Sequence, residues 1–389
     1  MSWEIKKLSE CCASIADGDH QAPPKADSGI PFVTISNINS TNQFDFTNTM
    51  FVPQAYYDGL DSKRKAQKGD VLYSVVGSFG IPVYMRETVP FVFQRHIAIL
   101  RPNDAILPQF LYYTMLSRDF YMMADAAALG AAQRTVSLTA LRNMKIAVPP
   151  MDVQKKIVDI LSAYDDLIEN NQKQIKLLEE ASQRLYKEWF VDLRFPGHET
   201  TPITDGIPEG WKRAKLIDIV KVQYGYAFDG SLFNANGKGV PIVRIRNIPA
   251  GTTADYTTEE ADTQYIVHNG DILVGMDGEF HINSWSGPDA YLVQRTCSFR
   301  PNNPNMKGYL LQAIYEPIKY FESTVVGATV AHLGKKHVDT ITVLTGPKEL
   351  YVPFQQYFER RQLLLNQNRL LVESRDRLLP KLMNGEIEV

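Results

Sequence analysis

The alternation of apolar and polar residues repeats itself in two stretches that lie far apart along the chain. The stretch GIPFVTISNIN begins at Gly29, and the stretch GVPIVRIRNIP begins at Gly239. In each, apolar residues at every second position follow a Gly-x-Pro turn, a pattern that predicts a strand running into a loop. The two stretches therefore indicate two copies of one structural unit.

Further blocks match in the same order along the chain. WEIKKLSE from Trp3 pairs with WKRAKLID from Trp211, KGDVLYSVVGSFG from Lys68 with NGDILVGMDGEF from Asn269, FQRHIAILRP from Phe93 with VQRTCSFRP from Val293, and GAAQRTVSL from Gly130 with GATVAHL from Gly327. The common order predicts two homologous modules of mixed α/β (α+β) fold, residues 1–150 and 210–346. Each has an ordinary domain size of roughly 140 residues.

A different periodicity follows each module. Apolar positions there recur at alternating spacings of four and three, the heptad pattern of a coiled coil. We expect a central helix at 151–190 and a distal helix at 347–389, and a linker rich in proline, glycine and threonine at 191–209. The predicted seam consists of Ile157, Leu161, Ile168, Asn171, Ile175, Leu178, Leu185 and Trp189 in the central helix, and Phe358, Leu365, Asn368, Val372 and Leu379 in the distal helix.

The two helices are expected to pair with each other. Each seam has an asparagine near its middle, Asn171 and Asn368, where a buried polar pair can fix the register. A two-fold relation between the module–helix units predicts an antiparallel coiled coil that separates the modules in a pseudo-two-fold dumbbell. The alternative is two amphipathic helices that pack only on their own modules, but about 57 Å for about 38 residues exceeds what such a module needs. Pro380 should kink or end the distal helix.

Composition narrows the classes of protein that remain. The chain has 389 residues, of which 44% are hydrophobic and 22% charged, as in a globular protein. It has no apolar run long enough to span a bilayer, so we expect it in the cytoplasm. The three cysteines, Cys11, Cys12 and Cys297, exclude a disulfide framework and lack zinc-site spacing. With a net charge of −3, any binding of nucleic acid must depend on local patches.

Three segments carry a resemblance to a known family. ASQRLYKEWFVDLRFPGHE from Ala181, IPEGWKRAKLIDIV from Ile207 and RDRLLPKLMNGEIEV from Arg375 strongly resemble conserved regions of the DNA specificity subunit of type I restriction-modification systems. The resemblance covers the whole chain. It implies that each module is a target recognition domain that reads one half of a bipartite, asymmetric site in double-stranded DNA.

The resemblance also implies partners and cofactors. The helices would separate the two readers and dock two methyltransferase subunits, with restriction and translocase subunits joining outside. No cofactor would be bound by this chain, because S-adenosylmethionine belongs to the methyltransferase partner, and ATP and magnesium to the restriction partner.

Missing motifs agree with a non-catalytic subunit. The chain has no G-x-x-x-x-G-K-[ST] loop, no G-x-G-x-x-G fingerprint and no H-E-x-x-H pair, and the Asn/Asp-Pro-Pro-aromatic tetrapeptide of amino-methyltransferases is absent. Asp70 and Asp271 each follow a glycine, and we interpret them as turns that enter a strand rather than as nuclease carboxylates. Two alternatives stay open: a solitary methyltransferase or nuclease, and a tandem-module scaffold that binds protein or glycan.

Residue chemistry suggests where DNA would be touched. Bases are read by Arg, Lys, Asn, Gln and short polar groups, and phosphates by Lys, Arg and exposed amides. The candidates in the first module are Ser36, Asn37, Lys63, Arg64, Lys65, Ser78, Phe79, Gln133, Arg134 and Thr135; those in the second are Arg244, Arg246, Asn247, Asp277, Glu279, His281, Thr329, His332, Lys335 and Lys336. The basic run at 63–65 could equally be a solvated face, and the matching asparagines a shared turn.

Differences between the copies carry more weight than matches, because the readers of two different half-sites should differ. The pairs Gln94-Arg95 and Gln294-Arg295 recur, which suggests a scaffolding role. The mismatches Ser36 against Arg246, and Gln133-Arg134 against Val330-Ala331, are the stronger candidates for base reading.

Overall fold

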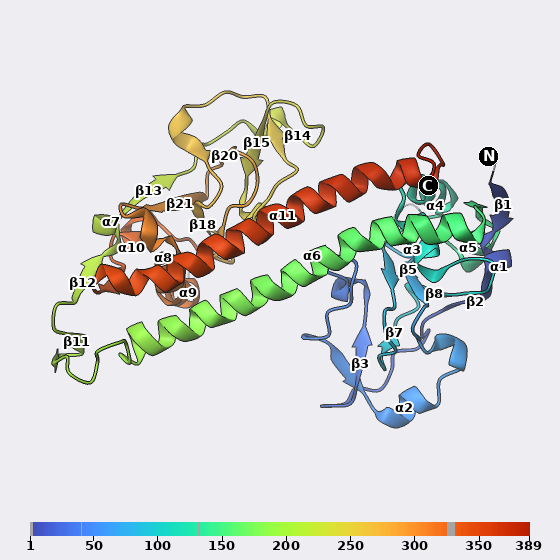
Figure 1. Ribbon diagram of the computed structural model, residues 1–389, viewed down its shortest axis with the longest axis horizontal. Helices are drawn as coiled ribbons and strands as arrows, with labels where there is room; N and C mark the ends of the chain where they lie inside the picture. The colour runs from blue at the N-terminus through green and yellow to red at the C-terminus, as the bar shows by residue number, and fades with distance from the viewer. Residues whose placement is uncertain (1–2, 40, 131–132, 325–330) are drawn as a thin grey trace. The chain divides into compact units, whose positions relative to one another are not determined.

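The computed structural model describes residues 3–39, 41–130, 133–324 and 331–389 (Figure 1). By its internal contacts the chain divides into two compact units, residues 1–166 with 372–389 and residues 167–371. Each unit contains one module and parts of two long helices.

The first module is built on two small sheets. The antiparallel sheet has the order β2-β8-β5-β6, and the second sheet has the order β4-β3-β7, in which β3 and β7 are parallel. The terminal strands β1 and β9 pair antiparallel and close the module. The strands are β1 (Glu4–Lys7), β2 (Cys12–Asp17), β3 (Ile30–Val33), β4 (Met50–Val52), β5 (Val71–Ser74), β6 (Pro82–Tyr84), β7 (Val92–Phe93), β8 (Ile97–Pro102) and β9 (Lys145–Val148).

The second module repeats this topology and adds the strands β14 and β17 to its second sheet. Its antiparallel sheet has the order β13-β21-β18-β19, its second sheet the order β14-β16-β15-β20-β17 with β15 and β20 parallel, and β12 pairs with β22. The strands are β12 (Lys212–Lys215), β13 (Val220–Tyr224), β14 (Phe233–Asn234), β15 (Val240–Val243), β16 (Tyr256–Thr257), β17 (Ile266–Val267), β18 (Ile272–Gly275), β19 (Ile282–Ser284), β20 (Ala290–Leu292), β21 (Thr296–Pro301) and β22 (Thr342–Thr345). The prediction of two homologous mixed modules is confirmed.

Short helices complete the modules. In the first they are α1 (Leu8–Cys11), η1 (Ile35–Asn37), α2 (Gln54–Asp58), η2 (Ser62–Arg64), α3 (Pro108–Leu116), α4 (Arg118–Ala127) and α5 (Leu138–Asn143). In the second they are α7 (Leu216–Ile219), η4 (Gly230–Leu232), η5 (Ile245–Asn247), η6 (Thr263–Tyr265), η7 (Pro304–Met306), α8 (Lys307–Ala313), α9 (Tyr315–Thr324), α10 (Lys335–Val338) and η8 (Lys348–Tyr351).

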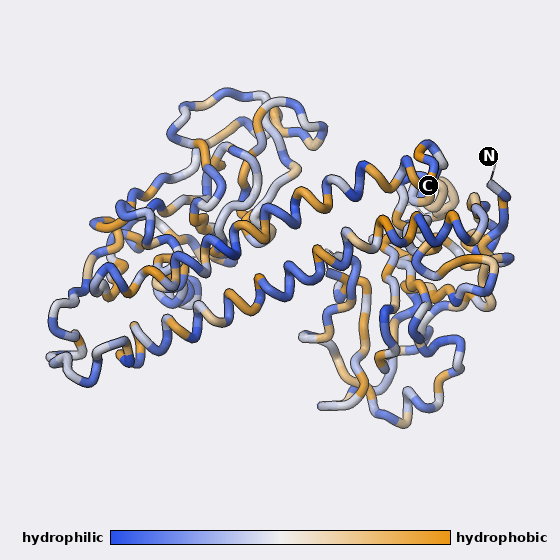
Figure 2. The backbone as a smooth tube through the Cα atoms, in the orientation of Figure 1, coloured by the Kyte–Doolittle hydropathy of each residue, from blue (hydrophilic) through white to orange (hydrophobic). Residues whose placement is uncertain are grey.

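Two long helices follow the modules, α6 (Met151–Tyr186), which continues into the π-helical turn η3 (Lys187–Val191), and α11 (Val352–Met383). In the second unit Asn171 Nδ2 donates to Asn368 Oδ1 at 2.9 Å, and Arg361 pairs with Glu179 at 2.6 Å. Later residues of α6 thus meet earlier residues of α11, so the helices pair antiparallel. The predicted antiparallel coiled coil is confirmed. Apolar and polar residues alternate along both helices in Figure 2.

The seam residues predicted from the heptads are all buried or half-buried. Both helices also enter the cores of the modules. In the first unit Leu161 and Leu379 pack with Phe110 of α3, and in the second Phe190 and Phe354 pack with Tyr309 of α8. Helix pairing and packing on the modules, which the sequence presented as alternatives, therefore occur together.

Two details differ from the simplest expectations. Helix α11 runs through Pro380 and ends at Met383, because a proline in the last turn removes only one intrahelical hydrogen bond. Residues 191–209 contain a small hairpin, β10 (Ile203–Thr204) with β11 (Ile207–Pro208), and Phe195 of this stretch packs on Trp211 at a ring distance of 4.6 Å.

The cysteines are all buried and free. Burial raises the pKa of Cys297 to about 12, so its thiol is unreactive at neutral pH. Within the described ranges we find no helix with the length and apolar character needed to cross a membrane.

Candidate nucleic-acid interface

A pair of parallel strands brings one of the predicted polar segments beside a polar turn. Strands β3 and β7 run parallel, with Val33 opposite Phe93, so the residues that follow them emerge at the same edge. These residues are η1, which contains Ser36 and Asn37, and the turn at Gln94–His96. In the second module η5 and the turn at 293–295 emerge in the same way after the parallel strands β15 and β20.

Two more segments join this edge through backbone hydrogen bonds. The amide of Val75 donates to His96 O at 2.8 Å, and the amide of Val136 donates to Val75 O at 2.9 Å. The amide of Gly77 donates to Arg134 O at 3.0 Å. The loop after β5 and the segment at 133–136 therefore lie beside the turn. We call this convergence of four segments the loop edge of the module.

The second module builds its loop edge with the same bonds. The amide of Met276 donates to Arg295 O at 2.9 Å, and the amide of Leu333 donates to Met276 O at 2.8 Å. The amide of Gly278 donates to Ala331 O at 3.1 Å. Candidates that are distant in the sequence, such as Asp277 and His332, thus become neighbours.

One glycine in each module lies at the end of a strand, Gly18 after β2 and Gly225 after β13. It allows the turn before β8 or β21 to pack closely on that strand end. A Cβ added at Gly18 would lie 2.2 Å from Phe93 O, and one at Gly225 would lie 2.1 Å from Val293 O. Real Cβ atoms do not approach carbonyl oxygens so closely, so only glycine fits. Next to these glycines, Arg95 N donates to Asp19 O at 2.9 Å and Gln294 N donates to Tyr226 O at 2.7 Å.

The hydrogen bonds show that the Gln-Arg pairs of the two modules are not equivalent. Arg95 N and Gln294 N make the same bond, and so do His96 O and Arg295 O. Arg95 therefore corresponds to Gln294, and His96 to Arg295, one residue out of step with the match read from the sequence. The match of the two Gln-Arg pairs, from which the scaffolding role was inferred, is therefore wrong. The signal was present: the block in the second module is one residue shorter, and alignment from its Arg-Pro end gives the correct register.

The matching asparagines belong to the turn. Asn37 Oδ1 accepts from Thr34 N at 2.9 Å, and Asn247 Oδ1 accepts from Arg244 N at 2.8 Å. Their amide nitrogens are also used, toward Asp45 O at 3.5 Å and Asp255 Oδ2 at 3.2 Å. Of the two interpretations of this match, the geometry favours a shared cap.

The glycine-aspartate turns carry buried ion pairs. Arg101 holds both carboxylate oxygens of Asp70 at 2.9 Å, and Arg300 holds Asp271 at 2.6 Å. Both aspartates are nearly inaccessible, with 2% and 5% of their surface exposed. These carboxylates fix the entry to β5 and β18, as the turn interpretation requires, and they do not face solvent as nuclease ligands would.

At the first loop edge, some of the candidate side chains already have protein partners. Arg134 pairs with Asp125 and lies over the ring of Phe79, which stacks on Tyr121 with ring centroids 5.7 Å apart. In the loop after β5, the carbonyl of Ser78 accepts from Ser74 Oγ at 3.0 Å.

The basic run lies in and beside η2. Arg64 contacts Asp17 at 3.8 Å, and Lys65 donates to Asp58 O at 2.9 Å, whereas Lys63 is exposed. Only Lys63 therefore matches the solvated-face interpretation.

A hollow in the first loop edge gathers several polar side chains. Its lining includes Asp17, His20, Arg95, His96, Gln133 and Thr135. His20 Nε2 lies 2.7 Å from Asp17 Oδ2. Burial and the neighbouring Arg95 lower the pKa of His96, so its imidazole is neutral at pH 7. None of Asp17, His20, Arg95 and His96 was among the DNA-binding candidates. Arg95 was set aside because the Gln-Arg pair recurs, and nothing in the sequence links the other three to Gln133 and Thr135.

The second loop edge is richer in arginine. Its hollow is lined by Arg244, Arg246, Gln294 and Arg295 together with Phe228 and Phe233. Arg246 forms a two-point ion pair with Asp255, with distances of 2.6 and 3.2 Å. Burial opposes ionisation of Asp255, but the hydrogen bonds from Arg246 and Asn247 lower its pKa below the usual value. Arg244 lies over the ring of Phe233 at 5.5 Å.

An acidic residue organises the other side of this edge. Asp277 accepts from Arg295 Nη1 at 2.6 Å and contacts His332 Nδ1 at 2.5 Å. Nearby, Glu279 and His281 lie 3.4 Å apart. In α10, Lys335 pairs with Asp339 at 2.7 Å and Lys336 is exposed. The predicted candidate Thr329 lies outside the described residues.

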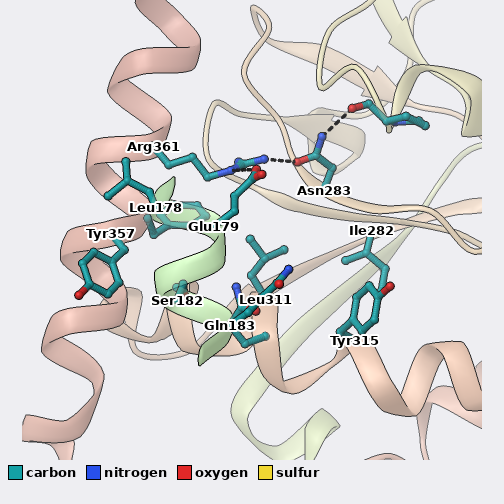
Figure 3. Close-up of a pocket in the computed structure, with 14 residues that line it drawn as sticks. Leu178, Glu179, Ser182, Gln183, Ile282, Asn283, Leu311, Tyr315, Tyr357 and Arg361 are labelled. Atoms are coloured by element: carbon teal, nitrogen blue, oxygen red, sulfur yellow. Dashed lines mark hydrogen bonds and ion pairs between the residues drawn. The ribbon is translucent and has the colours of Figure 1, made fainter. Parts of the chain in front are cut away.

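A different hollow in the second unit is formed where both long helices meet the module (Figure 3). Arg361 of α11 points toward Glu179 of α6, and its other donors reach Ser284 Oγ at 2.6 Å and Asn283 Oδ1 at 2.9 Å on β19. Arg361 is 8% exposed, and the carboxylate of Glu179 neutralises its charge inside the fold. We assign it a structural role, tying the helix pair to the sheet.

One family model matches the chain twice. The model of the type I restriction modification DNA specificity domain matches residues 2–180 and 208–368. The chain belongs to this family. Each matched segment contains one complete loop edge, so the family's specificity domain occurs here twice.

Individual relatives agree. The chain is 27% identical over 312 residues to the type I restriction enzyme MjaIX specificity subunit of Methanocaldococcus jannaschii, covering 74% of this chain and 71% of the relative. It is 22% identical over 441 residues to the HindI specificity subunit of Haemophilus influenzae, covering 92% and 95%. The crystal structure of the type I restriction-modification S subunit from M. genitalium shares the fold, with a TM-score of 0.57 at 15% identity over 98% of this chain and 96% of that one.

Proposed function

We propose that this specificity subunit reads a bipartite, asymmetric site in double-stranded DNA. The observation that supports this proposal is the duplicated loop edge, in which the same backbone bonds present different polar side chains. A common framework with different contact residues suits two readers of two different half-sites. Arginine, glutamine and histidine at these edges are side chains that hydrogen-bond to base edges in the major groove.

The chain itself would be non-catalytic and direct the other subunits. We infer that two methyltransferase subunits dock on it and that restriction and translocase subunits join them. S-adenosylmethionine would be held by the methyltransferase partner, and ATP and magnesium by the restriction partner. The exposed leucines on the long helices, Leu177, Leu363 and Leu370, offer apolar contacts for such a partner.

Selection from a random DNA duplex pool tests this proposal. The complex of the chain with its cognate methyltransferase subunits should enrich duplexes that contain two short defined blocks around an undefined spacer of fixed length. The affinity should fall steeply with salt, because phosphate contacts release counterions. Enrichment of no sequence, or binding that is insensitive to salt, would favour a scaffold that binds protein or glycan.

A further inference from the structure

The match between the two copies in the sequence misaligned one part of the loop edge. This part is the turn that leads into β8 in the first module and into β21 in the second. It consists of Arg95 and His96 before β8 in the first module, and of Gln294 and Arg295 before β21 in the second. It lies at the centre of the loop edge, because its backbone bonds to the loop after β5 or β18 and to the segment that follows β2 or β13.

The backbone of this turn makes the same hydrogen bonds in both modules. Each turn receives one hydrogen bond from the loop residue Val75 or Met276, and each donates one to Asp19 O or Tyr226 O. Gly18 and Gly225 allow the close approach that these bonds need. The framework is therefore conserved between the copies, whereas both side chains of the turn change.

The changed side chains are available for contact. Arg95, Gln294 and Arg295 are exposed and His96 is half-buried. Within the described part of the chain, the guanidinium of Arg95 has no ion-pair partner. Arg295 is held through Nη1 by Asp277, and an arginine keeps further N–H donors when one is used. Its φ of 68° is unusual for a residue with a side chain, and such conformations cluster at functional sites.

We propose that Arg95 and His96 read bases of one half-site, and that Gln294 and Arg295 read bases of the other. This inference rests on the proposed function and assigns its specificity to one turn in each module. Arginine pairs with guanine and glutamine with adenine through two hydrogen bonds, so a change at the turn changes the preferred base.

Exchange of the turn residues tests the assignment without removing polar groups. The variants are R95Q/H96R, which gives the first module the second turn, and Q294R/R295H, which does the reverse. R95A and Q294A are added as truncations. Lys145→Ala in β9 and Arg213→Ala in β12 serve as controls, because both are exposed cations in the terminal strand pairs, away from the turn. The readout is the methylated motif in cells that express each variant with the methyltransferase subunits.

The expected result is local. Each turn variant should alter one or two positions in one half of the motif, with discrimination there reduced about 5- to 150-fold, and leave the other half unchanged. The unchanged half shows in the same molecule that the chain is folded and assembled. If both halves of the motif are unaltered in all four variants, or if methylation falls on all sites without a change of motif, the assignment is wrong. A wild-type chain that gives no split motif would instead refute the proposed function.

Discussion

The buried pair of Arg101 and Asp70 shows how single residues hold the loop edge. The guanidinium bonds both oxygens of the carboxylate and also donates to Lys65 O at 3.0 Å, so it ties the start of β5 to the end of η2. In the second module Arg300 bonds one carboxylate oxygen of Asp271, Oδ2, through two nitrogens and reaches Ile266 O at 2.6 Å. These residues position the reading surface without being part of it.

Removal of one partner of such a pair leaves the other charge buried without compensation. We therefore expect Arg101→Met to lower the free energy of unfolding by about 3 kcal/mol. Breaking a buried ion pair usually costs about 3–5 kcal/mol. We expect the lower end of this range because the Arg101 side chain is 24% exposed. Urea denaturation of the purified chain measures it, with Lys145→Met as the exposed control. Equal midpoints for Arg101→Met and its control would contradict this account of the pair.

The close approach at Gly225 gives a second residue-level prediction. Gly225→Ala forces a methyl group against Val293 O, and we expect overpacking of about 1–3 kcal/mol with displacement of the turn. The second half of the methylated motif should then weaken. Gly230→Ala, in the lining of the same hollow, is the matched control for stability, because nothing lies within 4 Å of its added Cβ. A Gly225→Ala variant that reads both half-sites as the wild type does would show that the turn need not be held there.

At the scale of the element, the helix pair combines an apolar seam with one polar contact. Asn171 is 3% exposed and donates to Asn368, which in turn lies 3.4 Å from Ile168 O through its own amide. A buried asparagine pair stabilises less than two leucines would, but it disfavours other registers. The pair therefore explains why each helix has one polar residue in its apolar seam, at positions that face each other.

A double-mutant cycle on this pair tests its role. Asn171→Leu alone leaves Asn368 Oδ1 without its hydrogen-bond donor, and we expect a loss of about 1–3 kcal/mol. The double variant N171L/N368L should recover this loss or exceed the wild-type stability in urea denaturation. Additive losses in the two single variants and the double variant would mean that the two side chains are not coupled.

The outer face of α11 is expected to bind the methyltransferase. Leu363 and Leu370 are 47% and 52% exposed and lie seven residues apart, so they share one face of the helix. The double variant L363K/L370K should weaken association with the methyltransferase subunit on the order of tenfold or more. Ile217→Lys in α7 is the control, an exposed apolar residue of the module that is 39% exposed. Equal affinities in titration calorimetry would exclude this face.

Some elements could be predicted from sequence and others could not, for physical reasons. Strands β3 and β15 and both helices carry their periodicity locally, and they were predicted correctly. The equivalence of Arg95 with Gln294 was missed, because the letters Gln-Arg occur in both blocks one residue out of step, although the turns between the strands are equally long. The hollow of the first module joins His20 to Gln133, and only the folded backbone brings residues so distant together.

For the whole molecule, the central point is duplication with divergence. The two modules share the strand order of the four-stranded sheet, the terminal strand pair, the buried ion pair and the hydrogen bonds of the turn. They differ in the charge of their loop edges, since arginines gather in the second hollow and histidines in the first. A molecule that reads one symmetric sequence would not need this difference, and we therefore expect two unlike half-sites.

Mapping of methylated bases by single-molecule sequencing of genomic DNA tests this claim most directly. The DNA would come from cells that express the chain with its cognate methyltransferase subunit, and from cells that lack the chain. The account predicts a split motif, with two short unlike blocks around an undefined spacer of fixed length, present only with the chain. Active methyltransferase that produces no motif, or one continuous motif, would contradict it.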